Sequence, residues 1–194
     1  MFFMGYKGIL FCLSGPAGAG KDSIKQGLLA KNSALSKWVS TSSRSPRKGE
    51  IDGRDYFFIS QEDFKDKINR GEFIEYDSIN DSYYVSIGTK EQFDTALQNG
   101  RFMVHDITVG GVRNLKELYG SNIICIFIVT PSLAEIEARL KLRGDSPEVI
   151  KARLELAEIE MKAANDTNIV DYVVLNKDLD MAIEECNQII KKHI

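Results

Sequence analysis

The sequence contains few of the residues on which disulfide-linked and metal-binding proteins depend. Its 194 residues include three cysteines and two histidines. The cysteines, Cys12, Cys125 and Cys186, lie far apart and form no C-x-x-C pair, and two of them lie inside apolar runs. This pattern favours buried thiols in a reducing compartment and argues against a metal site built from cysteine.

An excess of positive charge is also absent. There are 25 Lys and Arg residues against 28 Asp and Glu residues, and the formal net charge is −3. Proteins that bind nucleic acid broadly carry a basic surface, so we expect no nucleic-acid partner. Any anionic ligand must be bound by positive charge gathered at one place rather than by the field of the whole protein.

Long hydrophobic runs are missing as well. No apolar run approaches the roughly 20 residues that a membrane span requires, and we expect no membrane association. The opening segment, MFFMGYKGILFCLSG, is apolar, but it has no basic start and leads directly into a glycine-rich loop. A first buried strand explains it better than a signal peptide does, so we expect a cytoplasmic protein.

What the sequence does contain is a set of apolar runs of strand length. The four runs are ILFCL (9–13), RFMVHDI (101–107), IICIFIV (123–129) and YVVL (172–175). Strands that are covered on both faces have this continuous pattern, which predicts a parallel sheet. Segments with apolar residues at helical spacing lie between the runs, so we expect an α/β fold with helices flanking the sheet.

Residues 37–90 depart from this alternation. DYFFIS, FIEYDSI and DSYYVSI have the alternating pattern of short strands, and one helical stretch, QEDFKDKINRG, separates them. We interpret the region as a small antiparallel excursion inserted into the α/β core. A second inserted piece, from about 140 to 155, is dense in charge.

The motif G-x-x-x-x-G-K occupies Gly15 to Lys21, between a predicted strand and a predicted helix. That context is typical of a loop that binds phosphate. Glycines let the backbone approach phosphate oxygens, and the helix N-terminus offers N–H groups and a positive dipole. Lys21 adds a charge for the β and γ phosphates. The residues predicted to bind ATP here are Gly15, Pro16, Ala17, Gly18, Ala19, Gly20, Lys21, Asp22 and Ser23.

Asp22 follows the lysine, where a hydroxyl residue often ligates Mg²⁺. An aspartate can coordinate Mg²⁺ directly or through water, because hard cations prefer carboxylate oxygen. It can instead lie in the first helical turn, where the dipole favours negative charge. Ser23 can take the hydroxyl role one position later. ATP binding is compatible with each alternative.

Several polar side chains are further candidates. Arg44 and Arg47 lie three residues apart and can form a bidentate clamp for a phosphate, to which Tyr56 and Tyr84 can add hydroxyl groups. Taken singly, such arginines are usually solvated and such tyrosines half-buried. Asp106 ends an apolar strand and is expected to face the ligand crevice, with capping of a helix near residue 110 as an alternative or second role.

The charged segment RLKLRGDSPEVIKARL (139–154) is similar to the lid of kinases that transfer phosphate from ATP. Arg139 and Arg143 are four residues apart and share a helical face, and Arg153 follows on the next helix. On closing, such a lid would bring these cations onto ATP phosphates, expel water and stabilise the transferred group. A solvated charged face is the alternative, and it suits Lys141 and Lys151 better.

The stretch VSTSSRSPRKGEIDGRDYFFIS (39–60) resembles the GMP-binding region of guanylate kinases, which are P-loop nucleoside monophosphate kinases. The resemblance continues through GEFIEYDSINDSYYVSIGT (71–89), HDITVGG (105–111), RLKLRGDSPEVIKARL (139–154) and DYVVLNKDLDMAI (171–183). It covers nearly the whole chain in order, which is far more specific than the glycine loop alone.

The resemblance implies a P-loop kinase fold with an inserted small mixed α+β subdomain and a helical lid. The core would comprise 1–36, 95–131 and 156–194, the GMP-binding insert 37–94 and the lid 132–155. The implied reaction is ATP + GMP giving ADP + GDP with Mg²⁺, with dGMP as a possible second acceptor. The protein would be a monomer or a homodimer, with open and closed states.

The resemblance also implies roles for individual residues. The catalytic group comprises Lys21, Arg44, Arg143 and Arg153. Arg139 and Asn176 join the loop in binding ATP, Asn176 near adenine. The GMP site comprises Ser40, Arg44, Arg47, Tyr56, Glu75, Tyr84, Ser86 and Thr108, with Glu75 accepting the guanine N–H groups and Ser40 near O6. Asp106, Asp22 and Ser23 would hold Mg²⁺, partly through water.

Three positions depart from the family pattern. Besides Asp22, Thr108 stands where an aspartate usually helps to receive the guanine amino group, and Val85 replaces a glycine. The tetrapeptide GKDS also occurs in ribose 1,5-bisphosphate phosphokinases, which resemble guanylate kinases without the GMP-binding segment, so a sugar-phosphate kinase is the first alternative. The second is an inactive module that binds phosphopeptides, although such modules usually have an eroded phosphate loop.

Overall fold

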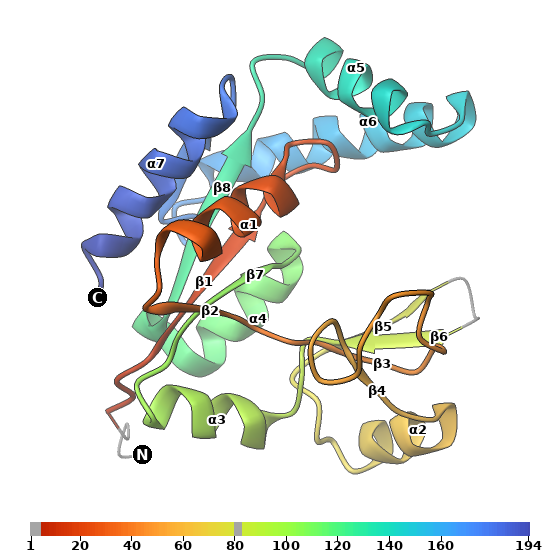
Figure 1. The fold of residues 1–194 in the computed structure, drawn as a ribbon, viewed down its shortest axis with the longest axis vertical. Coiled ribbons are helices and arrows are strands. Elements are labelled where there is room, and N and C mark those ends of the chain that lie inside the picture. Colours follow the sequence, from red (N-terminus) through yellow and green to blue (C-terminus); the bar gives the residue numbers. More distant parts are fainter. Residues whose placement is uncertain (1–4, 80–82) are drawn as a thin grey trace. The chain divides into compact units, whose positions relative to one another are not determined.

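The computed structural model describes residues 5–79 and 83–194. The chain divides into two compact units. We call Ile9–Ser36 with Phe102–Ile194 the large unit, and Met1–Gly8 with Lys37–Arg101 the small unit. Each unit is described by itself (Figure 1). No helix among the described residues has the length and hydrophobicity to cross a membrane.

The large unit is built on a five-stranded sheet with the strand order β2-β7-β1-β8-β9. Its strands are β1 (Ile9–Ser14), β2 (Leu35–Lys37), β7 (Phe102–Asp106), β8 (Ile123–Val129) and β9 (Tyr172–Leu175). β1 pairs in parallel with β7 and β8, and β8 pairs in parallel with β9. The four predicted strands and the α/β fold class are confirmed. β2 was not predicted, because three residues carry too little periodicity to identify a strand.

Helices connect these strands. In chain order they are α1 (Lys21–Lys31), α4 (Val109–Tyr119), α5 (Leu133–Arg143), α6 (Pro147–Lys162) and α7 (Leu179–Lys191), with 3-10 turns at Gly120–Asn122 and Ala163–Asn165. α1 and α7 pack side by side, and α4 contacts β1 and β8. Leu10 and Phe127 are buried on the sheet as fully as Phe11 is, so both faces are covered at the central strands β1 and β8.

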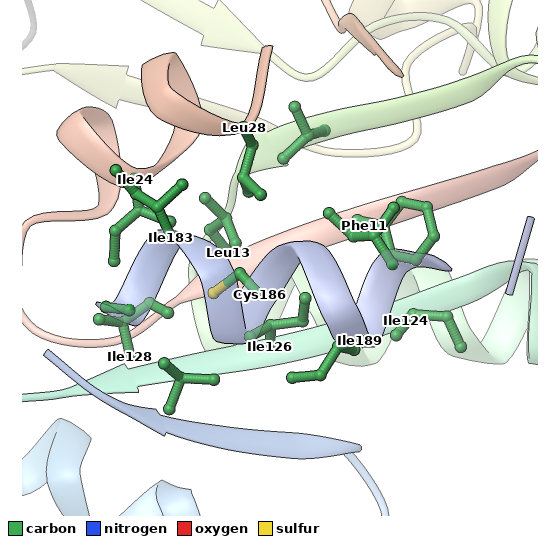
Figure 2. Packing of buried hydrophobic residues seen from close by; sticks show 14 of the residues in the cluster. Phe11, Leu13, Ile24, Leu28, Ile124, Ile126, Ile128, Ile183, Cys186 and Ile189 are labelled. Carbon is green, nitrogen blue, oxygen red and sulfur yellow. The ribbon is translucent and has the colours of Figure 1, made fainter. Parts of the chain in front are cut away.

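The main hydrophobic core lies between the sheet and the pair α1 and α7 (Figure 2). Ile24 and Leu28 of α1 and Ile183 and Cys186 of α7 meet alternate residues of the strands, such as Leu13 of β1. Cys186, Cys12 and Cys125 are all buried, as the apolar runs predict. This core fixes α1, and therefore the loop that precedes it, against the end of β1.

Helices α5 and α6 form a pair with a small apolar cluster of their own, made by Ile136, Leu140, Ile150 and Ala157. Ser132 caps the start of α5 by accepting a hydrogen bond from the Glu135 N–H. Gly144 ends the helix in the left-handed conformation, with φ 86°. Glycine adopts this conformation at little cost, so the chain can turn sharply between the two helices.

The small unit contains a four-stranded sheet with the order β4-β3-β6-β5. Its elements are β3 (Thr41–Ser42), β4 (Phe57–Phe58), α2 (Gln61–Asn69), β5 (Tyr76–Ile79), β6 (Tyr83–Ser86) and α3 (Lys90–Gln98). The antiparallel character predicted for this region holds for β5–β6 and also for β3–β6, although β3 itself was not predicted, and it is wrong for β3–β4, which is parallel. The connection from β3 to β4 is too long for a hairpin, so alternation alone could not set the direction of this pair.

Aromatic side chains form the core of the small unit. Phe64 of α2 contacts Phe73 at a ring separation of 4.4 Å and stacks on Tyr84 at 5.4 Å. Trp38 packs on Phe93 of α3 at 4.4 Å and donates its indole N–H to a backbone carbonyl. These contacts hold the helices against the short strands, which are too short to be stable alone.

Candidate active site

The glycine loop begins where β1 ends and leads directly into α1. Gly15, Gly18 and Gly20 have φ values of 126°, 86° and 94°. A Cβ atom on Gly15 would lie 2.3 Å from the Ile128 carbonyl oxygen, so no other residue fits there without a shift of the backbone. The loop therefore owes its shape to glycine, and the first turn of α1 presents N–H groups without intrahelical partners beside it.

Lys21 lies across this loop. Its Nζ atom donates to the carbonyl oxygens of Gly15 at 2.5 Å and Pro16 at 3.0 Å. Burial lowers the pKa of Lys21, and the carboxylates of Glu160, Asp106 and Asp22 oppose that effect. An ammonium group held by neutral carbonyls in a partly dry place can turn to an anionic ligand without giving up an ion pair.

The loop opens on a cavity of about 460 Å³ within the large unit. It is lined by Ala17, Gly18, Gly20, Lys21, Asp22, Ser23, Asp106, Arg139, Leu140 and Arg143. The structure thus brings together the predicted loop, a predicted metal ligand from β7 and two predicted lid arginines from α5. The volume lies in the range of small-ligand sites.

Arg139 and Asn176 both reach the loop from other elements. Arg139 donates to the Asn176 carbonyl at 2.9 Å, to the Ala19 carbonyl at 3.4 Å and to the Glu135 carboxylate at 3.0 Å. The buried Asn176 side chain donates to the same Ala19 carbonyl at 2.7 Å. The two residues border a second cavity of about 260 Å³ with Gly20.

Arg143 and Arg153 share a carboxylate that sequence reasoning missed. Asp145 accepts two hydrogen bonds from Arg143, and the Arg153 Nε atom lies 3.7 Å from its Oδ2. Hydrogen bonds from Arg143 lower the pKa of Asp145. The glycine turn between the helices brings these groups together, and an acidic residue beside two predicted lid arginines was the signal available in the sequence.

The predicted metal ligands contact a second lysine that sequence reasoning missed. Lys25, on α1, donates to Asp106 Oδ1, and its Nζ lies 2.9 Å from Asp22 Oδ1. Burial opposes its charge, but Asp106 and Asp22 together raise the pKa of Lys25. Burial likewise opposes the charge of Asp106, whereas His105 and Lys25 lower its pKa. The spacing of Asp22 and Lys25, i and i+3 on a helix, was the available signal.

These donors suit a hard cation that is shared with phosphates. Asp22 and Asp106 both reach the position of one ammonium group, and Ser23 lines the same cavity. Within residues 5–79 and 83–194, no three His, Cys, Asp or Glu side chains are arranged to hold a metal by themselves. Mg²⁺ is usually bound through one or two carboxylates plus substrate phosphates, so the residues present fit Mg²⁺.

The small unit places Arg44 among an anion and two aromatic rings. Its guanidinium makes a bidentate pair with Glu50, at 2.6 and 2.7 Å, and lies 5.1 Å from the ring centre of Tyr56 and 5.5 Å from that of Phe58. Glu50 also accepts from the Arg47 N–H at 2.6 Å. Hydrogen bonds from Arg44 and Arg47 lower the pKa of Glu50 to about 2.

Other predicted GMP residues gather near the start of β3 and the end of β6. Ser86 donates to the Glu75 carbonyl at 2.6 Å and accepts from the Gly88 N–H at 3.1 Å. Ser40 is buried and directly precedes Thr41, which pairs with Ser86 across the sheet. The roles of Ser40, Glu75 and Ser86 toward a base stay predictions.

Thr108 lies in the large unit, at the start of α4. Its Oγ1 accepts from the Gly111 N–H at 3.1 Å and caps the helix. The alternative that Asp106 caps this helix is therefore wrong: Asp106 lies two residues too early, and Thr108 has the extended backbone of an N-cap. Its hydroxyl oxygen is therefore a capping atom, and its contact with a guanine amino group stays a prediction.

The first strand of a parallel sheet leads into a glycine loop, and a lysine begins the helix that follows. Arginines reach the same cavity from a separate helical pair. This arrangement is that of a P-loop nucleotide phosphotransferase. A family model described as guanylate kinase matches residues 7–193. The chain belongs to the guanylate kinase family.

Individual relatives are similar in sequence to this chain over most of their length. The guanylate kinase of Bacteroides thetaiotaomicron is 39% identical over 189 residues, which are 96% of this chain and 90% of the relative. That of Clostridioides difficile is 38% identical over 186 residues, covering 95% and 87%. A crystal structure of guanylate kinase from Anaplasma phagocytophilum matches with a TM-score of 0.72 at 24% identity, covering 96% and 86%, and shows the same fold.

Proposed function

We propose that the protein transfers the γ-phosphoryl group of ATP to GMP, giving ADP and GDP. The observation that carries this proposal is the cavity beside the glycine loop, where Lys21, Asp106 and Arg143 line one space. The family match over residues 7–193 supports GMP as the acceptor.

ATP is assigned to the large unit. Its phosphates would take the loop N–H groups and Lys21, whose Nζ exchanges the carbonyls of Gly15 and Pro16 for phosphate oxygens. Its base would lie toward the second cavity, beside Asn176 and Arg139. Because Arg139 and Asn176 are already held by backbone carbonyls near Gly20, this side of the site is largely preformed.

GMP is assigned to the small unit. Its phosphate would bind Arg44, Arg47, Tyr56 and Tyr84, and would replace the Glu50 carboxylate as the partner of Arg44. A guanidinium fork suits phosphate as well as carboxylate, so this exchange keeps the bidentate geometry. Glu75 and Ser40 would read the guanine edge, and Thr108 would contribute one hydroxyl oxygen.

The chemistry requires no general base, because the attacking phosphate oxygen is already anionic. The protein positions the two phosphates and stabilises negative charge on the transferred group. Lys21, Arg143 and Arg153 would do so, the two arginines after leaving Asp145. Mg²⁺, when bound at Asp106, Asp22 and Ser23, would supply charge neutralisation at the ATP phosphates.

An ADP-release assay with ATP and Mg²⁺ tests the proposal against GMP, dGMP, AMP, UMP, CMP and ribose 1,5-bisphosphate as acceptors. We expect GMP to have the highest kcat/KM, with dGMP second. Turnover of the sugar bisphosphate in preference to GMP would assign the protein to the alternative kinase class. ATP binding without turnover of any acceptor would identify a binding module instead.

A further inference from the structure

Lys25 has a role in neither the family resemblance nor the reaction proposed above, yet it lies at the proposed metal site. It stands one turn after Lys21 on α1, and its side chain is only 11% exposed. Its Nζ contacts Asp22 Oδ1 at 2.9 Å and also contacts Asp106 Oδ1. One buried ammonium therefore joins two carboxylates that come from α1 and β7.

The two partners differ in their surroundings. The Asp22 side chain is 78% exposed, whereas that of Asp106 is 36% exposed. Lys21 donates to carbonyls of the loop. Lys25 is thus the cation that these two carboxylates share, and its Nζ lies within ligand distance of the oxygens that a divalent cation would need.

We propose that Lys25 is a positioning residue that acts as the resident counter-cation of the metal site. It holds Asp22 and Asp106 together in the nucleotide-free protein, and a divalent cation reaches these carboxylates only in competition with its ammonium group. The inference rests on the proposed assignment of Asp22 and Asp106 to Mg²⁺. A charge of the same sign at contact distance disfavours the metal strongly in a partly buried site.

This arrangement links metal binding to nucleotide binding. In the protein alone, Asp22 and Asp106 face the ammonium group of Lys25 in direct contact and that of Lys21 at longer range, which leaves little net negative charge for a divalent cation. ATP adds several negative charges at the same place and offsets the repulsion. We therefore expect a metal site that is weak without nucleotide and forms together with the nucleotide phosphates.

The test is an Mn²⁺ titration of the nucleotide-free protein, in which electron paramagnetic resonance measures the free Mn²⁺. Lys25→Met should bind Mn²⁺ at least about tenfold more tightly than the unchanged protein. Lys25→Met combined with Asp106→Asn should lose that gain. Lys31→Met is the matched control: Lys31 lies on the same helix, is 46% exposed and pairs with Glu184 at 3.7 Å, so its loss should leave the affinity unchanged.

A folded Lys25→Met protein with unchanged Mn²⁺ affinity would overturn the proposal. If that variant does not fold, Lys25→Gln replaces it, and Lys25→Arg should bind Mn²⁺ as weakly as the unchanged protein. If no neutral variant folds, the Mn²⁺ affinity of the nucleotide-free, unchanged protein is the test. A nucleotide-free site tighter than about 1 mM would contradict competition by Lys25, and a weaker nucleotide-free site that Lys25→Arg leaves equally weak would support it.

The same variants separate this inference from the proposed function. The Mn²⁺ titration uses no acceptor, so it stands even if GMP is not the substrate. If GMP is phosphorylated while Mn²⁺ affinity is insensitive to Lys25, only the inference about Lys25 fails. In the ATP-dependent assay, Lys25→Met should lower the Mg²⁺ concentration that gives half-maximal rate, which a purely structural role would not do.

Discussion

The cation of the glycine loop and the cation of the proposed acceptor site are held in different ways. Lys21 in the large unit donates to two neutral carbonyls. Arg44 in the small unit is bound bidentately by the Glu50 carboxylate. Both cations make charge-assisted hydrogen bonds, but only Arg44 has the added attraction of an opposite charge in a bidentate pair. The proposed donor site is therefore ready for an anion, whereas the proposed acceptor site requires an anion that outcompetes a carboxylate.

This difference suggests how each site selects its ligand. A triphosphate at the loop would have no carboxylate to displace from Lys21, whose hydrogen-bond partners are neutral carbonyls. A monophosphate carries about two charges where Glu50 carries one, so it can displace Glu50 from Arg44, and a singly charged ligand gains less. The predictions below test the two sites in order of decreasing effect.

Removing the loop cation should have the largest effect. Lys21→Ala should lower kcat by about 10³-fold or more, because a preorganised cation at the transferred group is lost in a partly buried site. The thermal midpoint should change little, since the hydrogen bonds that are lost are two bonds to neutral backbone carbonyls of the loop. A turnover number within a few-fold of the unchanged protein would exclude the loop assignment.

Removing the acceptor cation should act mainly on GMP. Arg44→Ala should lower kcat/KM for GMP by about 10²-fold while the KM for ATP stays the same, because the lost bidentate contact concerns the acceptor phosphate. Arg54→Ala is the control, since Arg54 is an exposed arginine of the same unit paired with Asp55 at 2.7 Å. Equal losses in both variants would show that Arg44 has no special role.

Removing the Glu50 carboxylate, which competes with a phosphate for Arg44, is a second test of the proposed acceptor site. Glu50→Gln should lower the KM for GMP by about threefold, because Arg44 no longer has to leave an ionised partner. Kinetics at varied GMP with saturating ATP measure it. A raised KM would mean instead that Glu50 is needed to orient Arg44, and it would contradict competition between Glu50 and the phosphate.

Thr108 offers a change that adds charge without removing the cap. Thr108→Asp should raise the preference for GMP over AMP by about fivefold, because a charged acceptor binds a guanine amino group more strongly. Aspartate is also a good N-cap, so α4 should keep its stability. An unchanged ratio of kcat/KM values would place Thr108 outside the base site.

The smallest effect is a dependence on pH. Because the pKa of Glu50 falls from 4.5 to about 2 on folding, the pair with Arg44 stabilises the protein above pH 4.5 and loses this contribution as the pH falls toward 2. Between pH 5 and pH 2.5, the thermal midpoint of the unchanged protein should therefore fall further than that of Glu50→Gln. If the thermal midpoints of the two proteins fell in parallel with pH, the lowered pKa of Glu50 would be contradicted.

Local sequence patterns were sufficient for much of the fold. The runs 9–13 and 123–129 form central strands, and residues buried on both faces must be apolar throughout. The run 172–175 forms an edge strand in which Val173 and Leu175 are exposed, so its apolar pattern indicated a strand but not burial on both faces. Local patterns were not sufficient for β2 or for the direction of β3–β4, because three-residue and two-residue strands owe their existence to the neighbours that pair with them.

By itself, the sequence determined the glycine loop, the lysine at the start of α1 and the chemical kind of each candidate ligand, since these depend on backbone freedom and residue type within a few positions. Only the tertiary structure decided which charges meet. Lys25 donates a hydrogen bond to Asp106, which lies 81 residues later in the chain. Asp145 pairs with both Arg143 and Arg153, because a glycine turn brings the two helices together. Ion pairs act through space at a few ångströms, so their partners are known only when the chain is folded.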